Sequence, residues 1–319
     1  MTTSATSATG TTADPVLSRR LAALQQHYSG QFSVAARNLA TGEEILVDPH
    51  RTYPTASTFK VPIMVEVFRQ VEAGDFALDD RVDFKESDIV HGSGVLRDLQ
   101  PGLNPTIHDL LTLMIIVSDN TATNMLIDKV GGVEPINKTM ADLGFTSIDI
   151  KTRIDFERIA GDNRALAVAS PWDLMQIMTG IVQDTMISAS ASAAMREILG
   201  RQHYLGQATR YLGYNPYAEE TNGKRPLWVG SKTGSLKGMR ADTGIWRLGN
   251  GTDITFAVMN EGCSDPGFGS EYEGDIVNGI LGWIVLSHWW PTDDLGPMPG
   301  GKSPYLDAVL GDLTQNDGV

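Results

Sequence analysis

The spacing of apolar residues at the start of the chain predicts a helix followed by two strands. Leucines recur at helical spacing between Pro15 and Tyr28, so this segment is expected to form an amphipathic helix. Apolar and polar residues then alternate over residues 32–36. Thr41-Gly42 favours a turn from there into a second strand at residues 43–47.

In the middle of the chain the apolar residues recur with the spacing of a helix instead. Residues 57–73 are apolar nearly all round, which predicts a helix that is buried on all sides. Start and stop signals predict further helices at residues 106–117, at residues 121–131, from residue 170 onward and at residues 188–199.

The period changes back to that of strands near the end, at residues 227–231, 243–248 and 254–258, and a long helix follows at residues 270–290. Two early strands, three late strands and a helical block between them indicate the α+β class. We therefore predict one five-stranded antiparallel sheet, flanked by the terminal helices in an α/β/α sandwich, with an inserted all-helical domain.

This arrangement predicts a sheet domain from residues 15–52 and 225–290, and a helical domain from residues 53–224. Residues 1–14 are expected to form a flexible lead, and residues 291–319 a C-terminal tail. The lead lacks the basic and apolar regions of a secretory signal. We expect a cytoplasmic protein if Met1 is the natural start, and a periplasmic or secreted one otherwise.

Composition and charge exclude several classes of protein. The chain has 319 residues, a formal net charge of −14 and no basic stripe, so nucleic-acid binding is not expected. No run approaches the ~18 apolar residues of a membrane span. The single cysteine, Cys263, excludes an internal disulfide and a cysteine-rich metal site. We predict no metal and no cofactor.

One motif in the tail is misleading. Residues 296–303 match the phosphate-loop pattern of nucleotide-binding proteins letter for letter. Such a loop needs backbone N–H groups that converge on phosphate, and Pro297 and Pro299 remove such donors. Nucleotide binding is therefore not predicted.

Ser57 and Lys60 lie three residues apart at the start of the predicted buried helix, so their side chains are expected on one face. A serine hydroxyl is a poor nucleophile until a base takes its proton, and a neutral lysine can do that. The helix N-terminus also presents N–H groups to a developing oxyanion. Alone, the pair is more typical of a capping serine and a solvated lysine than of a catalytic pair.

Two later motifs place polar groups at the ends of predicted elements. Ser118-Asp-Asn120 falls in the break between two helices, where a short loop can point a hydroxyl and an amide into a cleft. Lys232-Thr-Gly-Ser235 ends a strand, where the glycine lets a substrate lie alongside and the lysine offers an anion site. Each motif alone also fits a cap or a turn, but three in this order are far more specific.

The three motifs together are the serine–lysine signature of class A β-lactamases and penicillin-binding proteins. Over roughly residues 15–290 the chain resembles this superfamily of penicillin-interacting serine hydrolases. The resemblance implies the same sheet with an inserted helical domain. It also implies a hydrolase that opens β-lactam rings, acts on a small-molecule substrate and needs no cofactor. We expect a monomer.

The resemblance also implies a role for each motif residue. Ser57 would form the acyl-enzyme, Lys60 would transfer protons, and Ser118 would relay a proton to the leaving nitrogen. Substrate binding would fall to Asn120 for the amide, to Lys232 and Thr233 for the carboxylate, and to Gly234, Ser235 and Arg240 beside them. The backbone N–H groups of Ser57 and Ser235 would form the oxyanion hole, and Arg240 would be a second carboxylate anchor.

The segment that should supply the base for deacylation departs from the family pattern. Class A enzymes carry a glutamate there, with an asparagine four residues later. In this chain the nearest acid is Glu157, and Asn163 is six residues later. We predict that Glu157 is the deacylation base and that Asn163 helps to hold the water, although a solvated loop acid would look the same.

Two alternatives remain open at this point. One is a D-amino-acid peptidase or esterase of the same fold, in which the base differs or the acyl-enzyme is long-lived. The other is a noncatalytic penicillin-binding sensor. Turnover of a chromogenic cephalosporin separates the β-lactam hydrolase from both.

Overall fold

The computed structural model describes residues 14–214, 227–265, 267–269 and 271–290, and the single residues 295, 307, 309, 311 and 312. Five strands form one antiparallel sheet in the order β2-β1-β8-β7-β6. Their bounds are β1 Gln31–Asn38, β2 Glu44–Val47, β6 Leu227–Leu236, β7 Met239–Leu248 and β8 Asp253–Glu261. The predicted fold class and sheet are confirmed.

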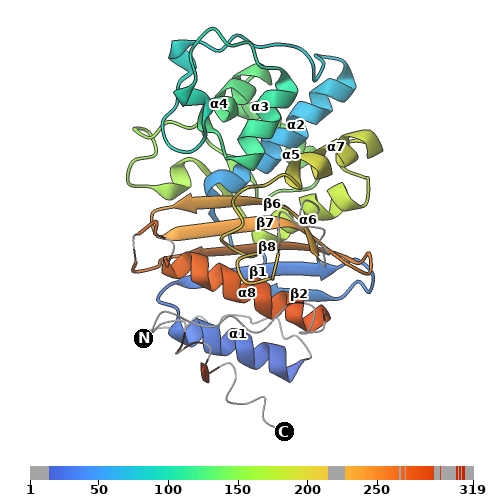
Figure 1. The fold of residues 1–319 in the computed structure, drawn as a ribbon, viewed down its shortest axis with the longest axis vertical. Coiled ribbons are helices and arrows are strands. Elements are labelled where there is room, and N and C mark those ends of the chain that lie inside the picture. Colours follow the sequence, from blue (N-terminus) through green and yellow to red (C-terminus); the bar gives the residue numbers. More distant parts are fainter. Residues whose placement is uncertain are drawn as a thin grey trace, which may run out of the picture.

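Helices pack on both faces of this sheet (Figure 1). Their bounds are α1 Pro15–His27, α2 Lys60–Ala73, α3 Ile107–Ile116, α4 Asn120–Lys129, α5 Val133–Asp142, α6 Pro171–Val182, α7 Ala189–Leu199 and α8 Glu273–Trp289. A small second sheet has the order β3-β5-β4, with bounds Tyr53–Pro54, Ala167–Ala169 and Asp149–Ile150. No helix among the described residues is long and apolar enough to cross a membrane.

Alternation along the strands divides the core into two clusters, because successive side chains point to opposite faces of a sheet. Val34 pairs with Val258 and packs in the cluster that α1 and α8 cover. The next pair, Ala35 and Ala257, belongs to the cluster on the other side. Helix α6 covers that second face by packing on β1, β7 and β8.

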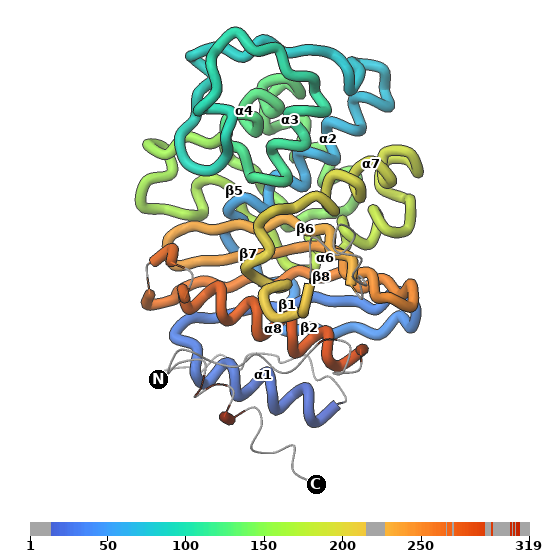
Figure 2. The backbone as a smooth tube through the Cα atoms, in the orientation of Figure 1, coloured from blue at the N-terminus to red at the C-terminus, as the bar shows by residue number. Residues whose placement is uncertain are grey.

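The chain leaves the sheet after β2, builds the helical part and returns to β6 after α7 (Figure 2). Two details of this path place the functional motifs. The helix predicted from Ser57 is a 3₁₀ turn, Ala56–Phe59, followed by α2. The strand predicted to end at Ser231 continues to Leu236, so Lys232 to Ser235 lie within β6. The phosphate-loop pattern at residues 296–303 lies outside the described residues.

Candidate active site

Ser57 lies in the 3₁₀ turn at the base of α2, on the wall of a cavity of about 380 Å³. The residue before it, Ala56, has a φ of 43°, a left-handed conformation that is costly for a residue with a Cβ atom. Thr58 holds this turn through its hydroxyl, which donates to the carbonyl of Thr55 at 2.7 Å. The same cavity is lined by Ser118, Asn120, Thr233, Gly234 and Ser235. The structure therefore brings together six of the residues singled out in the sequence.

Lys60 is fully buried behind this wall. Its Nζ donates to the carbonyl and the hydroxyl oxygen of Ser118, at 2.8 and 3.1 Å, and to Oδ1 of Asn120 at 2.9 Å. Burial lowers the pKa of Lys60 well below its ordinary value. The Lys232 ammonium lowers it further, and the Asp119 carboxylate opposes the shift. The neutral amine, which can accept a proton, is therefore favoured here far more than in an exposed lysine.

Ser118 occupies the three-residue break between α3 and α4, with a φ of 55°. Asp119 fixes this break in two ways. Its Oδ1 accepts from the backbone of Ala122 and caps α4, and its Oδ2 accepts from the backbone N–H groups of Val95 and Leu96 at 2.7 Å each. The carboxylate thus ties the loop before residue 97 to the start of α4 and leaves the Ser118 hydroxyl facing Lys60.

Ser93 is a cavity-lining residue to which the sequence motifs assigned no role. Its hydroxyl donates to the carbonyl of Ser118 at 2.7 Å and approaches Oδ1 of Asn120 at 3.2 Å. Asn120 in turn donates to the carbonyl of His91 at 2.9 Å. The 91–96 loop therefore orients both polar groups that Lys60 contacts.

Strand β6 forms the opposite wall, and Gly234 allows it to approach the Ser57 turn. A Cβ atom at this position would lie 2.7 Å from the carbonyl oxygen of Thr55 and 2.8 Å from the backbone nitrogen of Ser57. Any other residue would push the strand away from the Ser57 turn. Glycine is required here for close backbone approach and not for a positive φ.

Lys232 lies on the same strand but is fully buried, and it is absent from the described cavity lining. Its Nζ donates to the carbonyl of Thr233 at 2.7 Å. Burial lowers its pKa to about 7, and the Asp242 carboxylate opposes that shift. Lys232 therefore lies behind Thr233, with its amine bound to the backbone of the strand that lines the cavity.

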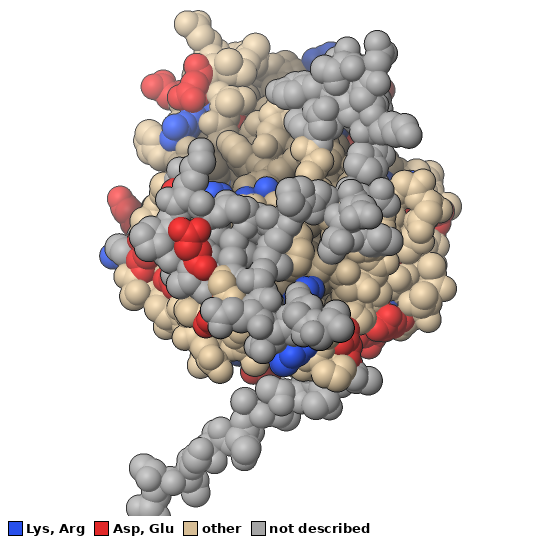
Figure 3. Space-filling view, turned by 60° about the horizontal axis from the view of Figure 1, so that its bottom comes forward, with Lys and Arg blue, Asp and Glu red and all other residues tan. Residues whose placement is uncertain are grey.

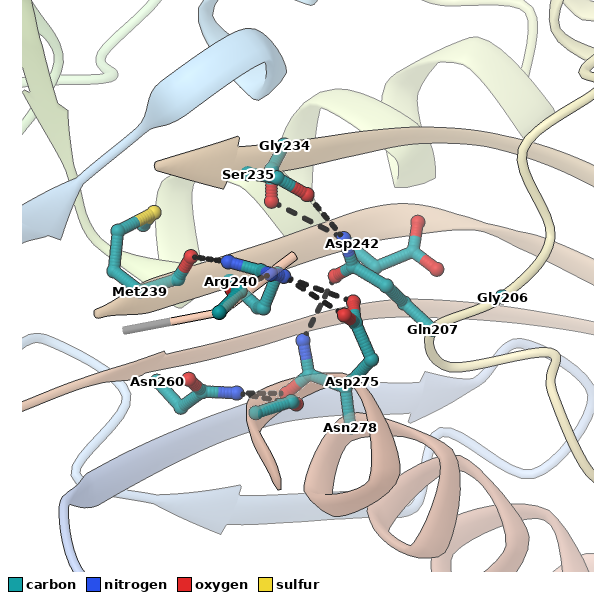
Figure 4. Close-up of polar contacts among 12 residues, drawn as sticks. Gly206, Gln207, Gly234, Ser235, Met239, Arg240, Asp242, Asn260, Asp275 and Asn278 are labelled. Carbon is teal, nitrogen blue, oxygen red and sulfur yellow. Dashed lines mark hydrogen bonds and ion pairs between the residues drawn. The ribbon is translucent and has the colours of Figure 1, made fainter. Parts of the chain in front are cut away.

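The structure does not bring Arg240 to the cavity, contrary to the expectation of a second carboxylate anchor. Although Arg240 pairs with Ser235 across β6 and β7, its guanidinium lies against α8 (Figure 4). Its Nε is 3.0 Å from both oxygens of Asp275, its other nitrogens donate to three backbone carbonyls, and it stacks 3.7 Å from the Tyr272 ring. The side chain is 1% exposed, so its donors are committed inside the protein.

Arg240→Met should therefore destabilise the fold by about 3–5 kcal/mol, because it leaves Asp275 as an unpaired buried carboxylate. Urea unfolding measures the change. The matched control is Arg247→Met on the same strand. Arg247 is 44% exposed in its pair with Asp253, and such a pair contributes about 0–1 kcal/mol. Equal stabilities of the two variants, with a raised KM for carboxylated substrates in Arg240→Met alone, would restore the anchor role.

Glu157 is also not where the sequence placed it. It is exposed and absent from the described cavity lining, whereas Phe156 and Ile159 on either side line the cavity. Asn163 donates to the carbonyl of Lys237 at 2.9 Å, so its side chain ties the loop to the β6–β7 turn. The loop cannot swing freely, because Arg164 bonds both carboxylate oxygens of Glu261 at 2.7 and 2.8 Å.

The residue that this loop presents beside the serine–lysine cluster is Ile154. Asn124 of α4 clamps its backbone from both sides, donating to its carbonyl at 2.8 Å and accepting from its N–H at 2.9 Å. The isoleucine side chain lines the cavity and is 6% exposed. With Phe156, Ile159 and Leu166 it makes this wall apolar. No Asp, Glu or His is among the described residues that line the cavity.

The described residues that line the cavity are all uncharged. Figure 3 shows a hollow whose surface is formed largely by uncharged residues, with Lys and Arg atoms at its border. Among the residues described, no group of His, Cys, Asp and Glu side chains is placed to hold a metal ion. The polar groups that the described part of the site brings together are serines, a buried lysine and their hydrogen-bond partners.

This fold is that of class A β-lactamases and penicillin-binding-protein-like enzymes. A family model described as "Beta-lactamase enzyme family" matches residues 16–289, and the chain belongs to this family of hydrolases. A β-lactamase from Sphaerobacter thermophilus is 30% identical with a TM-score of 0.74, over 90% of this chain and 98% of that one.

Two further solved structures show the same fold at lower identity. A leucine-to-glutamate mutant of PBP-A, described as an acyl-enzyme complex with penicillin G, has a TM-score of 0.74 at 23% identity. The match covers 86% of this chain and 96% of that one. A class A β-lactamase from Mycobacterium abscessus has a TM-score of 0.75 at 20% identity, over 86% and 99% of the two chains.

Proposed function

We propose that the protein opens β-lactam rings by transferring the acyl group to the hydroxyl oxygen of Ser57. The observation that carries this proposal is the fully buried Lys60, whose pKa is strongly lowered and whose amine contacts Ser118 and Asn120 in the cavity that Ser57 lines. A base in its neutral form beside a serine in a strained turn is what a serine nucleophile requires.

The proposed acylation moves one proton along this cluster. Ser57 Oγ attacks the lactam carbonyl carbon while its proton passes to the neutral Lys60 amine. The resulting oxyanion is stabilised by backbone N–H groups at the Ser57 turn and the β6 edge. The carbon–nitrogen bond then breaks, and a proton returns from Lys60 through the Ser118 hydroxyl to the leaving nitrogen. The product is an ester on Ser57 and a ring-opened amine.

Binding of the substrate carboxylate is assigned to Thr233 and Ser235, with Lys232 behind them. Both hydroxyl residues line the cavity next to Ser57. The Lys232 ammonium, where charged, supplies positive potential from a buried position that solvent does not screen. Asn120 is assigned to the substrate amide.

The second half of the reaction is proposed to be slow. Hydrolysis of the ester needs a base to activate a water, and the loop wall offers Ile154, Phe156, Ile159 and Leu166 instead of a carboxylate. The Lys60 amine is held by three hydrogen bonds to Ser118 and Asn120, the residues assigned to acylation and to substrate binding. This wall favours a long-lived acyl-enzyme. It also supports the second candidate function, a D-amino-acid peptidase or esterase that β-lactams acylate.

Ser57→Ala should abolish covalent labelling by penicillin G, because no other described serine lines the cavity at the start of α2. Intact-mass spectrometry, followed by peptide mapping of the adduct, checks this. Ser190→Ala, at an exposed serine on α7, is the control and should label like the parent protein. An adduct on any other residue of the parent protein contradicts the proposal.

A further inference from the structure

A buried amide, Gln207, lies directly behind the part of β6 that lines the cavity. Its side chain belongs to the segment between α7 and β6 and is 4% exposed. Its Nε2 donates to the carbonyl of Gly234 at 3.1 Å and to the hydroxyl oxygen of Ser235 at 3.2 Å (Figure 4). No sequence motif pointed to this residue, because it lies in a stretch without a periodic pattern.

The orientation of this amide is fixed by what surrounds it. The carbonyl oxygen of Gly234 can only accept, so the amide nitrogen must face β6 and the amide oxygen must face away. That oxygen accepts from Nδ2 of Asn278 in α8 at 2.9 Å. Oδ1 of Asn278 accepts in turn from Nδ2 of Asn260 at 2.8 Å, in β8.

At the other end of this row of three amides, Asn260 is also fixed with its nitrogen as donor and its oxygen as acceptor. Nδ2 of Asn260 also donates to the carbonyl of Gly274 at 2.9 Å, and Oδ1 of Asn260 accepts from the hydroxyl of Tyr28 at 2.8 Å. A backbone carbonyl, which cannot donate, therefore anchors the network at each end. The hydrogen bonds therefore fix which end of each amide, in Gln207, Asn278 and Asn260, is the nitrogen and which is the oxygen.

The fixed orientation of the Gln207 amide determines which hydrogen bonds the Ser235 hydroxyl can make. A hydroxyl has one hydrogen, and Ser235 already accepts a hydrogen bond from Gln207 on its buried side. Its own hydrogen is therefore free to point into the cavity, where Ser235 is exposed. The nearby guanidinium of Arg240 does not compete for this role, since Asp275 and backbone carbonyls occupy its donors.

We propose that Gln207 is a positioning residue that turns the Ser235 hydroxyl into a hydrogen-bond donor for the carboxylate of the substrate. The proposal rests on the function proposed above and identifies how this site selects an anionic substrate with no arginine among the described residues that line the cavity. A donor fixed before the substrate arrives loses little entropy on binding, and its hydrogen bond to a carboxylate is charge-assisted.

The test compares a penicillin with its neutral methyl ester as acylating agents. Gln207→Met keeps the volume but removes the amide. This variant should weaken binding of the penicillin about 10-fold, the effect expected for loss of one charge-assisted hydrogen bond. The limiting acylation rate and the binding of the methyl ester should be unchanged. Gln207→Glu should weaken penicillin binding by the same factor or more. Its carboxylate accepts the hydrogen of the Ser235 hydroxyl and so turns that hydrogen away from the cavity.

Ser235→Ala should show the same selective loss, and the double variant Gln207→Met/Ser235→Ala should be no worse than Ser235→Ala alone. Thr209→Val is the matched control. Thr209 is a buried residue of the same segment, and its hydroxyl accepts from the Trp246 indole and not from β6. This control should leave the ratio of penicillin to ester unchanged.

Equal losses on penicillin and ester, or additive losses in the double variant, would overturn the proposal. These outcomes differ from failure of the proposed function, in which the parent protein itself takes up neither compound. If Gln207→Met does not fold, Gln207→Glu and the Ser235→Ala comparison still decide, since Gln207→Glu preserves the shape of the side chain.

Discussion

Lys60→Met is expected to slow acylation of Ser57 by penicillin by about 10²–10⁴-fold, the contribution of a positioned general base. The methionine keeps the apolar stem of Lys60 but cannot accept the serine proton. Lys60→Arg should be equally impaired, because a guanidinium stays protonated at all accessible pH values. Stopped-flow or quenched mass spectrometry measures the rate. Lys138→Met, at a lysine that is 74% exposed on α5, is the control and should acylate normally.

The pH dependence of acylation in the parent protein follows from the same residue. The base is the neutral amine, so the rate should rise with pH as Lys60 loses its proton and level off above its folded-state pKa. Burial and Lys232 place that pKa well below the ordinary value of a lysine, so the plateau should begin far below pH 10.5. A rate that keeps rising to pH 10 or a fully active Lys60→Arg would contradict the assignment of Lys60 as the base.

Ile154→Glu is expected to speed release of the acyl group by about 10²–10⁴-fold, because it adds the base that the apolar wall lacks. The Asn124 clamp holds the backbone of residue 154 and would position the new carboxylate in the cavity. The measurement is the decay of the penicillin adduct after excess penicillin is removed. Acylation should change little, since Lys60 is untouched.

Ile154→Gln is the matched control, because it has the size and polarity of the glutamate without a basic oxygen. It should release the acyl group as slowly as the parent protein. Glu157→Gln should also leave release unchanged, since Glu157 is exposed and outside the cavity wall. A loss of release in Glu157→Gln, together with no gain in Ile154→Glu, would restore the base predicted from the sequence.

The serine–lysine cluster could be predicted from the sequence because its geometry is local. Ser57 and Lys60 are one turn apart, and a helix start fixes their relation whatever the rest of the fold does. Ser118 lies in a helix break that capping residues mark in the sequence, and Asn120 begins the helix that follows. The structure adds what spacing does not contain, namely that the Lys60 amine reaches across to both of these residues.

The positions of the Glu157 and Arg240 side chains could not be predicted from the sequence, because both depend on the direction in which a side chain points. In an irregular loop no period decides which residue faces inward, and Ile154 and Phe156 face the cavity instead of Glu157. On β7, Arg240 meets Asp275, which is 35 residues later in the chain. Such a long-range ion pair has no signature in local sequence.

The fold was predictable to the level of its layers but not of its shorter parts. The five strands and terminal helices have clear periods. Helix α5 was missed, as was the small sheet of β3, β4 and β5, whose strands have two or three residues each. These strands are too short for alternation to be detected, and they form because β3 leads into the Ser57 turn beside β5.

The most direct test of rapid acylation followed by slow release is a time course of the intact mass of the parent protein mixed with penicillin G. We expect a single adduct with the full mass of the penicillin, located on Ser57, that forms completely and persists long after free penicillin is removed. Fast consumption of penicillin with no accumulated adduct would contradict it, because the cavity wall would then supply an efficient deacylation base.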